Sequence, residues 1–250
     1  MKVTVLGCGT SGGVPKMPEH WGACDPSNPK NRRLRASILV EDAGTSVVVD
    51  TTPDFRAQML AAKVKKLDAV LYTHDHADHV HGIDDVRGFF QNTHEKIPVY
   101  GDAQTLGLIK HRFDYIFKSQ AGYPAICSAR EINGPLKIGG LKVVPFEQAH
   151  GNGISLGFRF GDIAYSTDVS SLPETAFEAL EGVKVWIVDA LRYEAHPTHS
   201  HLDKTLAWIE RVKPERAILT HMTWDMDYAT LRDSLPVGVE PAFDGLSITI

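Results

Sequence analysis

The fold is decided by one stretch of the sequence, Tyr72-Thr73-His74-Asp75-His76-Ala77-Asp78-His79. It carries the pattern HxHxDH and follows the short apolar run 68–72, which is typical of a buried strand. Three histidines and two aspartates lie within six residues. The alternative is a polar loop that is rich in histidine by chance. Because imidazole and carboxylate together form the ligand set of Zn²⁺ and similar divalent ions, the stretch predicts a metal site.

The spacing within this motif predicts two groups of ligands. His74 and His76 stand two residues apart, so both side chains can point the same way from an extended loop. Asp78 and His79 then fall on another side, where a second ion can bind.

Further ligands are expected at the ends of other strands. His150, Asp168 and His221 each stand just beyond an apolar run, at 143–149, 164–167 and 217–220. Any one of them alone could be an ordinary loop residue, but together they form a recurrent pattern. A carboxylate can bridge two cations, which imidazole cannot do, so Asp168 is the natural shared ligand.

The composition predicts one globular domain, residues 1–250, because a single α/β domain of this length is ordinary. The net charge of −5 excludes a general nucleic-acid or membrane binder, which usually shows a basic balance. A local basic patch remains at 30–35. The only cysteines, Cys8, Cys24 and Cys127, are too few and too widely spaced for a disulfide framework. With no export signal or membrane-spanning run, we expect a cytoplasmic protein.

The glycine-rich segment Gly7–Gly13 follows a predicted strand at 2–6 and contains GxGxxG. This pattern can mark a dinucleotide-binding turn, which also requires a helix to open at the glycines. Pro15 and Pro18 make a regular helix there unfavourable. The sequence therefore favours a glycine loop that lets the backbone approach a site or another loop closely.

The remaining periodicity predicts strands followed by strand–helix alternation, in each half of the chain. The expected strands are 35–41, 45–50, 97–100, 141–145, 154–160, 163–166, 185–188, 217–220 and 246–250. The expected helices are 53–62, 82–90, 103–111, 173–180, 202–212 and 228–234. This order predicts an α/β (α+β) fold, an αββα sandwich of two mixed sheets with helices outside.

The segment 112–136 has no clear period. Its aromatic residues are either a cap over a cleft or loop side chains packed onto the core. They are Phe113, Tyr115, Phe117 and Tyr123.

These motifs resemble the metallo-β-lactamase-fold hydrolases along nearly the whole chain. Asp50 matches the first motif, HxHxDH the second, and His150, Asp168 and His221 the third, fourth and fifth. The resemblance implies an αββα sandwich with two divalent metal ions, Zn²⁺ or Mn²⁺, between the sheets. It also implies that Asp50 orients the motif loop from outside the ligand set.

The resemblance further implies a division of the ligands between the two ions, with Asp78 also catalytic. It assigns His74, His76 and His150 to one ion, Asp78, His79 and His221 to the other, and Asp168 to both.

Within this superfamily the chain is similar to the phosphodiesterase branch, namely the cyclic phosphodiesterases of phosphonate breakdown and, more distantly, the tRNA 3′-processing endonucleases. The similarity lies in LGCGTSGGVP, residues 6–15, and HWGACDPSNPKNRR, residues 20–33. The cysteine cluster of an extra structural zinc is missing, so no third metal is expected. No large basic face is present, which argues against tRNA as the substrate.

The same branch carries a histidine that contacts phosphate and protonates the leaving group. His199 matches this position best, His201 is the second choice and His196 the third. We also expect that Arg32, Arg33 or Arg35 binds a terminal phosphate, because guanidinium matches it bidentately. Because side chains alternate along a strand, only one of them is expected to face the site.

The function implied is hydrolysis of a small phosphodiester, a nucleotide or a ribose cyclic phosphate, by a hydroxide that bridges two metal ions. The alternatives are a thioester, lactone or β-lactam hydrolase on the same metals, and a metal-loaded nucleotide-binding protein without turnover. We expect no membrane and no large nucleic acid among the partners. The oligomeric state stays open between a monomer and a homodimer.

Overall fold

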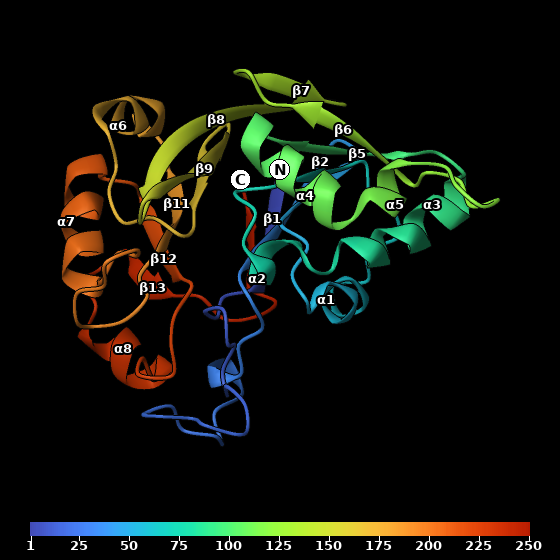
Figure 1. Cartoon of the computed structure of the whole chain (residues 1–250). Coiled ribbons are helices and arrows are strands. Elements are labelled where there is room, and N and C mark those ends of the chain that lie inside the picture. Colours follow the sequence, from blue (N-terminus) through green and yellow to red (C-terminus); the bar gives the residue numbers. More distant parts are fainter.

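The computed structural model describes residues 1–250 as two seven-stranded sheets that pack against each other with helices on the outside (Figure 1). The strand order of the first sheet is β14-β1-β2-β3-β4-β5-β6, and that of the second is β13-β12-β11-β10-β9-β8-β7. Both sheets are mixed. In the first sheet β2 pairs antiparallel with β3, whereas β3, β4 and β5 run parallel. In the second sheet β8, β9 and β10 pair antiparallel, whereas β10, β11 and β12 run parallel. The predicted αββα sandwich is confirmed.

The strands of the first sheet are β1 (Lys2–Gly7), β2 (Ser37–Asp42), β3 (Thr45–Val49), β4 (Ala69–Leu71), β5 (Ile97–Gly101), β6 (Cys127–Glu131) and β14 (Ser247–Thr249). Those of the second sheet are β7 (Leu136–Ile138), β8 (Leu141–His150), β9 (Gly153–Phe160), β10 (Ile163–Ser166), β11 (Val185–Asp189), β12 (Arg216–Thr220) and β13 (Val239–Pro241).

The helices beside the first sheet are α1 (Phe55–Ala61), α2 (Ala77–Val80), α3 (Arg87–Thr93), α4 (Ala103–Arg112) and α5 (Asp114–Phe117). Beside the second sheet lie α6 (Glu174–Leu180), α7 (Leu202–Val212) and α8 (Tyr228–Ser234). Two short 3-10 turns complete the set, η1 (Pro29–Asn31) and η2 (Ile83–Val86). None of these helices combines the length and the apolar character needed to cross a bilayer.

The central strands are apolar on both faces because each face meets a different partner. In β3, Val47 and Val49 belong to the core between the two sheets, whereas Val48 packs in the cluster beneath the helices. Successive side chains of a strand point to opposite faces, so this alternation follows from the strand period. The sandwich therefore buries a continuous apolar run, as the sequence of this strand predicted.

The glycine loop serves close backbone approach rather than dinucleotide binding. No helix opens at residues 9–13. A Cβ atom added at Gly7 would lie 2.1 Å from the carbonyl oxygen of Arg35, and one at Gly9 would lie 2.9 Å from Cβ of Arg33. Only glycine permits this contact between two loops, so the predicted close approach is confirmed.

Short strands and the central motif differ from the prediction. The edge strands β6 and β7, together with β13, have too few apolar residues to show a period. Asp78 and His79 lie in the one-turn helix α2 rather than in an extended loop. His150 is the last residue of β8, which runs five residues beyond the predicted end at residue 145.

The aromatic residues of segment 112–126 do not form a cap over the candidate site. Phe113 and Phe117 pack in part against the helix-covered core, whereas Tyr115 and Tyr123 remain 41% and 72% exposed. None of the four lines the cavity described below. The alternative interpretation, loop aromatics packed onto the core, describes Phe113 and Phe117.

Candidate metal centre

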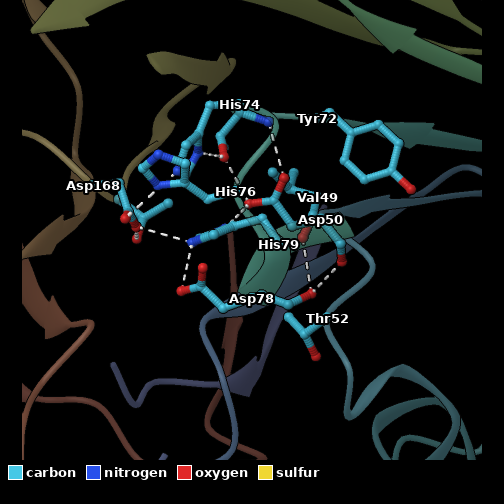
Figure 2. A network of polar contacts seen from close by, with 12 residues as sticks. Val49, Asp50, Thr52, Tyr72, His74, His76, Asp78, His79 and Asp168 are labelled. Atoms are coloured by element: carbon cyan, nitrogen blue, oxygen red, sulfur yellow. Dashed lines mark hydrogen bonds and ion pairs between the residues drawn. The ribbon is translucent and has the colours of Figure 1, made fainter. Parts of the chain in front are cut away.

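The predicted ligands meet at one edge of the sandwich because they follow parallel strands. His74 and His76 follow β4, Asp168 follows β10, and His221 follows β12. Since the carboxyl ends of parallel strands point to the same edge, residues distant in sequence come together there (Figure 2).

A first group consists of His74, His76, His150 and one oxygen of Asp168. Nε2 of His150 lies 3.3 Å from Nδ1 of His76. Nε2 of His74 and Nε2 of His150 lie 3.7 and 3.6 Å from Oδ2 of Asp168. The donor atoms of the four residues all lie within 4.8 Å of one another, as the ligands of one metal ion would.

A second group consists of Asp78, His79, His221 and the other oxygen of Asp168. Nε2 of His79 and Nε2 of His221 each lie 3.2 Å from Oδ1 of Asp168. Oδ2 of Asp78 lies 3.4 Å from Nε2 of His79 (Figure 2). Asp168 thus presents one carboxylate oxygen to each group.

The donor atoms fit a divalent cation. Nε2 atoms of His74, His79 and His221 are buried and have no hydrogen-bond partner. A buried polar atom without a partner costs free energy, so such atoms are rare unless a ligand satisfies them. Imidazole and carboxylate donors in this arrangement suit Zn²⁺ or Mn²⁺. The cluster could therefore hold divalent metal.

Side chains behind the two groups fix the imidazole rings. Nδ1 of His79 lies 2.7 Å from Oδ2 of Asp50, which is fully buried (Figure 2). Asp50 also accepts hydrogen bonds of 2.9 Å from the backbone N–H and the hydroxyl of Thr73. The Thr73 hydroxyl lies 2.9 Å from Nδ1 of His74. Asp50 is thus placed to orient the motif loop, and such outer partners typically align ligand imidazoles.

Three of these residues have strained backbones. Asp50, Asp168 and His221 have φ values of 66°, 52° and 59°, in the left-handed region that favours glycine. Each such residue costs on the order of 1–3 kcal/mol and persists only where the surroundings hold it. The strain lies where the two ligand groups meet, which marks this edge as a functional site.

The carboxylates and imidazoles shift one another's pKa values in the metal-free protein. Burial lowers the pKa of His221, but Asp168 and Asp78 outweigh it and raise the pKa to about 9. The pKa of His79 is likewise raised against its burial by Asp168, Asp78 and Asp50. Burial and the neighbouring His79 lower the pKa of His74 well below its usual value. The second group is therefore the more proton-rich.

His199 stands beside both groups and is held by a residue that the sequence did not single out. Nδ1 of His199 lies 3.0 Å from Oδ2 of the fully buried Asp189, the last residue of β11. Its ring stacks on that of His221, with centroids 4.8 Å apart. Nε2 of His199 lies 3.8 Å from Oδ2 of Asp168. The signal for Asp189 was its place at a strand end, which Asp168 shares.

The two other candidate histidines do not reach the cavity. His201 is the residue before α7, and its side chain makes no cap hydrogen bond. Nδ1 of His196 lies 3.2 Å from the Thr198 hydroxyl. Of the three, only His199 lines the cavity.

The three arginines also lie elsewhere, and the prediction for Arg33 is wrong. Arg33 is only 1% exposed, and its guanidinium donates to the carbonyl oxygens of Thr223 and Met226. Arg35 pairs with the carboxylate of Asp54 at 3.0 Å. Arg32 lies over the ring of Trp21. None of the three lines the cavity, so none is placed to bind a phosphate there.

The cavity over the two groups has a volume of about 510 Å³ and is lined mainly by polar residues. Ile154 is the only apolar residue among the 17 that line it, and none is Lys or Arg. The polar lining outside the two groups and His199 includes Ser11, Asp75, Asp102, Gln104, Thr105, Asn152 and Thr198. These residues come from several segments: Asp102, Gln104 and Thr105 lie at the start of α4, and the others on separate loops, so no single local pattern marked them in the sequence.

The model of the β-lactamase superfamily domain matches residues 45–222. An octanoyltransferase of Porphyromonas gingivalis is 32% identical, over the whole of this chain and 52% of its own length. A ribonuclease Z of Bradyrhizobium diazoefficiens is 28% identical over 54% of this chain and 46% of its own length. The chain thus spans about half the length of these curated relatives.

Solved structures share the fold over the full chain. A diphosphatase of the PhnP family has a TM-score of 0.93 and 39% identity, covering 100% of this chain and 97% of its own. The short form of human tRNase Z has a TM-score of 0.72 at 17% identity, covering 100% and 99%. The match to the family model, the fold and the His/Asp cluster agree: the chain belongs to the β-lactamase superfamily, has the metallo-β-lactamase fold and resembles the PhnP family.

Proposed function

We propose that this chain is a single-domain, dinuclear metal-dependent phosphodiesterase that hydrolyses a small nucleotide or ribose phosphodiester. The observation that supports it most is the placement of Asp168, whose two oxygens face two separate ligand groups. His199 stands beside both groups without belonging to either of the two that contain Asp168. Seven metal ligands and one free histidine suit a reaction that needs both charge stabilisation and a proton donor.

Bound divalent ions would lower the pKa of water and offset the negative charge on the phosphoryl oxygens. The chain's own residues supply the rest. Asp78 lines the cavity and can accept a hydrogen bond from the attacking water. His199 faces the cavity through Nε2 while Asp189 holds Nδ1, so a proton on Nε2 is aimed at the leaving oxygen.

The cavity lining supports a substrate with a sugar part and a single phosphate. Gln104 and Asn152 offer amides, which suit hydroxyl groups, whereas the carboxylates of Asp75 and Asp102 already pair with Arg112 and Thr105. No Lys or Arg lines the cavity, and Arg112, which contacts the lining residue Asp75, is already paired with that carboxylate, so a second phosphate would lack a free counter-charge. The same absence argues against the second candidate, a diphosphate bond, which the 39% identity to a diphosphatase favours.

Hydrolysis of an acyl thioester fits the lining less well. The octanoyltransferase relative acts on an acyl group, but that name describes a protein about twice as long as the matched region. An octanoyl chain requires apolar surroundings, and Ile154 alone provides them here. The polar cavity therefore favours the phosphodiester.

The test is a parallel assay of the metal-loaded protein on four substrates: bis(p-nitrophenyl) phosphate, a 2′,3′-cyclic nucleotide, ADP-ribose as a diphosphate, and an octanoyl thioester. Turnover of the first two at the highest kcat/KM is expected. Turnover of the thioester alone would reject the proposal, and fastest turnover of ADP-ribose would replace it with the diphosphatase. Nucleotide binding by calorimetry without any turnover would establish the non-catalytic alternative.

Metal binding to the second group should depend on pH more strongly than binding to the first. Below pH about 9 an ion must displace a proton from His221, whereas the pKa of His74 is already lowered. The apparent affinity of the second group should therefore rise with pH, by about tenfold per unit for each proton displaced. Titrations of the metal-free protein with Mn²⁺ between pH 6.5 and 8.5 measure the binding constants of both groups. If the logarithms of the two constants changed equally with pH, this electrostatic difference would be contradicted.

Asp189→Asn should lower kcat without changing the metal content, because Asp189 positions His199 and is no member of the two ligand groups around Asp168. The decrease in kcat should be smaller than the about 10²–10⁴-fold that a general acid contributes in full. It should be smaller still for a substrate with a nitrophenolate leaving group, which needs little protonation. Equal losses for good and poor leaving groups would show that Asp189 acts otherwise. Asp203→Asn, at the surface of α7, is the control.

A further inference from the structure

A long irregular segment, residues 14–33, which we call the arm, leaves the first sheet between β1 and β2. Figure 1 shows it in blue, projecting beyond the sheets. Its base is closed by hydrogen bonds of 2.9 Å in both directions between Val14 and Arg33. Apart from the 3-10 turn η1 it has no helix or strand of its own, so contacts with the rest of the chain must hold it.

Those contacts go to one place, the segment 221–228 that begins at His221, which we call the His221 loop. The backbone N–H groups of Ala23 and Cys24 donate to the carbonyl oxygen of Trp224 at 2.9 and 3.2 Å. The side chain of Asn31 accepts from the N–H of Tyr228 at 2.7 Å. The arm and the His221 loop thus form one hydrogen-bonded unit.

Arg33 is the centre of this unit. Its guanidinium donates to the carbonyl oxygens of Thr223 at 2.9 Å and Met226 at 2.6 Å. Arg33 is 1% exposed, yet it forms none of the ion pairs in the structure. A buried charge without a directly paired counter-ion is expensive. Here carbonyl dipoles, Asn31 and the sulfur of Cys24 contact the guanidinium, and the carboxylate of Asp244 attracts it from beyond ion-pair distance. An apolar side chain would fill this space at lower cost, which points to a role for the bonds that Arg33 makes.

His221 is the histidine of the cluster that depends most on its backbone. The rings of His74, His79 and His150 are each held through Nδ1, by Thr73, by Asp50 and by the carbonyl of Thr198. Both ring nitrogens of His221 are buried without a hydrogen-bond partner. Its φ of 59° is in addition strained. His199 stacks on this ring, but no hydrogen bond to Nδ1 holds it from behind, so the position of its backbone contributes more to its aim than in the other three histidines.

We propose that Arg33 is a positioning residue for the second ligand group: it fixes the His221 loop, and thereby the aim of Nε2 of His221, from the far side of the loop. Docking of the arm then sets the affinity of this group for a divalent ion. The first group has no ligand on this loop and does not depend on Arg33. This inference rests on the proposed pair of metal sites but on no particular substrate.

The test is calorimetric titration of the metal-free protein with Mn²⁺, without substrate. Wild type should show two binding events. In Arg33→Met, the dissociation constant of the event assigned to the second group should rise by about 10–100-fold, or that event should disappear. This is the usual effect of losing an outer partner of a metal ligand. The other event should keep its constant. A single event in wild type would refute the dinuclear site itself, which separates that failure from failure of this inference.

The chain offers a matched control in Arg159. Its guanidinium also donates to backbone carbonyl oxygens, those of Gly161, Ala179 and Glu181, each at 2.7 Å, and it does not line the cavity. Arg159→Met should therefore leave both binding events unchanged. Equal weakening of both events in Arg33→Met, or none, would overturn the inference, because a general loss of stability has no preference between the groups.

Chemical rescue distinguishes positioning from folding. In Arg33→Ala, methylguanidinium should restore the second binding event, whereas methylammonium at the same concentration should not, because only the planar fork reaches both carbonyls. Thermal unfolding of each metal-free variant shows that the chain is folded. If Arg33→Ala does not fold, Arg33→Lys replaces it, and a selective loss at the second group is again required. An unchanged second event in folded Arg33→Lys and Arg33→Met would contradict the proposal.

Discussion

Asp168→Ala is expected to lose most of the bound metal and all but a trace of the proposed phosphodiesterase activity. Asp168 is the only residue that belongs to both ligand groups, through Oδ2 at 3.6–3.7 Å and through Oδ1 at 3.2 Å. Its loss leaves two clusters of imidazoles with one carboxylate, Asp78, in the second group alone. We expect activity to fall by more than about 100-fold, since even outer partners of metal ligands contribute 10–100-fold.

Elemental analysis after dialysis measures this prediction directly. Wild type should hold two equivalents, and the variant well under one. Asp162→Ala is the matched control, because this carboxylate pairs with Lys184 at the surface and contacts neither ligand group. One tightly held equivalent in wild type, retained in Asp168→Ala, would reject the dinuclear site.

His199→Ala should separate chemistry from metal binding. If His199 protonates the leaving oxygen, its removal should lower kcat by about 10²–10⁴-fold while both metal equivalents remain. The loss should shrink for a nitrophenolate leaving group, which needs little protonation. If His199 only binds phosphate, good and poor leaving groups should suffer alike.

His201→Ala serves as the control, since His201 lies two residues away and does not line the cavity. It should keep the wild-type kcat. An inactive His201→Ala beside an active His199→Ala would move the acid role to His201. Loss of metal in His199→Ala would instead make His199 a ligand, in line with its place beside His221 and Asp189.

The ligand groups were predictable because each ligand ends an apolar run that is itself readable. Val47–Val49 and Ile218–Leu219 are unambiguous as buried strands, so the polar residues after them had to gather at one edge. The bounds of α7 agree with the prediction, because its apolar residues recur at helical spacing. Local periodicity thus carried both the fold and the first layer of the candidate site.

What the sequence could not show depends on contacts between distant segments. The run Arg32–Arg35 indicated guanidinium groups but not their partners, and Arg33 meets carbonyl oxygens 190 and 193 residues away. Asp189 ends a buried strand as Asp168 does, yet its partner His199 is identified only by packing. The short strands β6, β7 and β13 form because each pairs with a neighbouring strand, β5, β8 and β12, and not because their own residues show a strand pattern.

The central claim is that Asp168 bridges two ions with a phosphate between them and His199. It is tested most directly by a crystal structure of the protein with Mn²⁺ and inorganic phosphate, measured at the manganese absorption edge. Two anomalous peaks are predicted, one among His74, His76 and His150 and one among Asp78, His79 and His221, with Asp168 contacting both. The phosphate should lie over the two peaks, within hydrogen-bond reach of Nε2 of His199. A single peak, or a phosphate bound away from His199, would contradict the account.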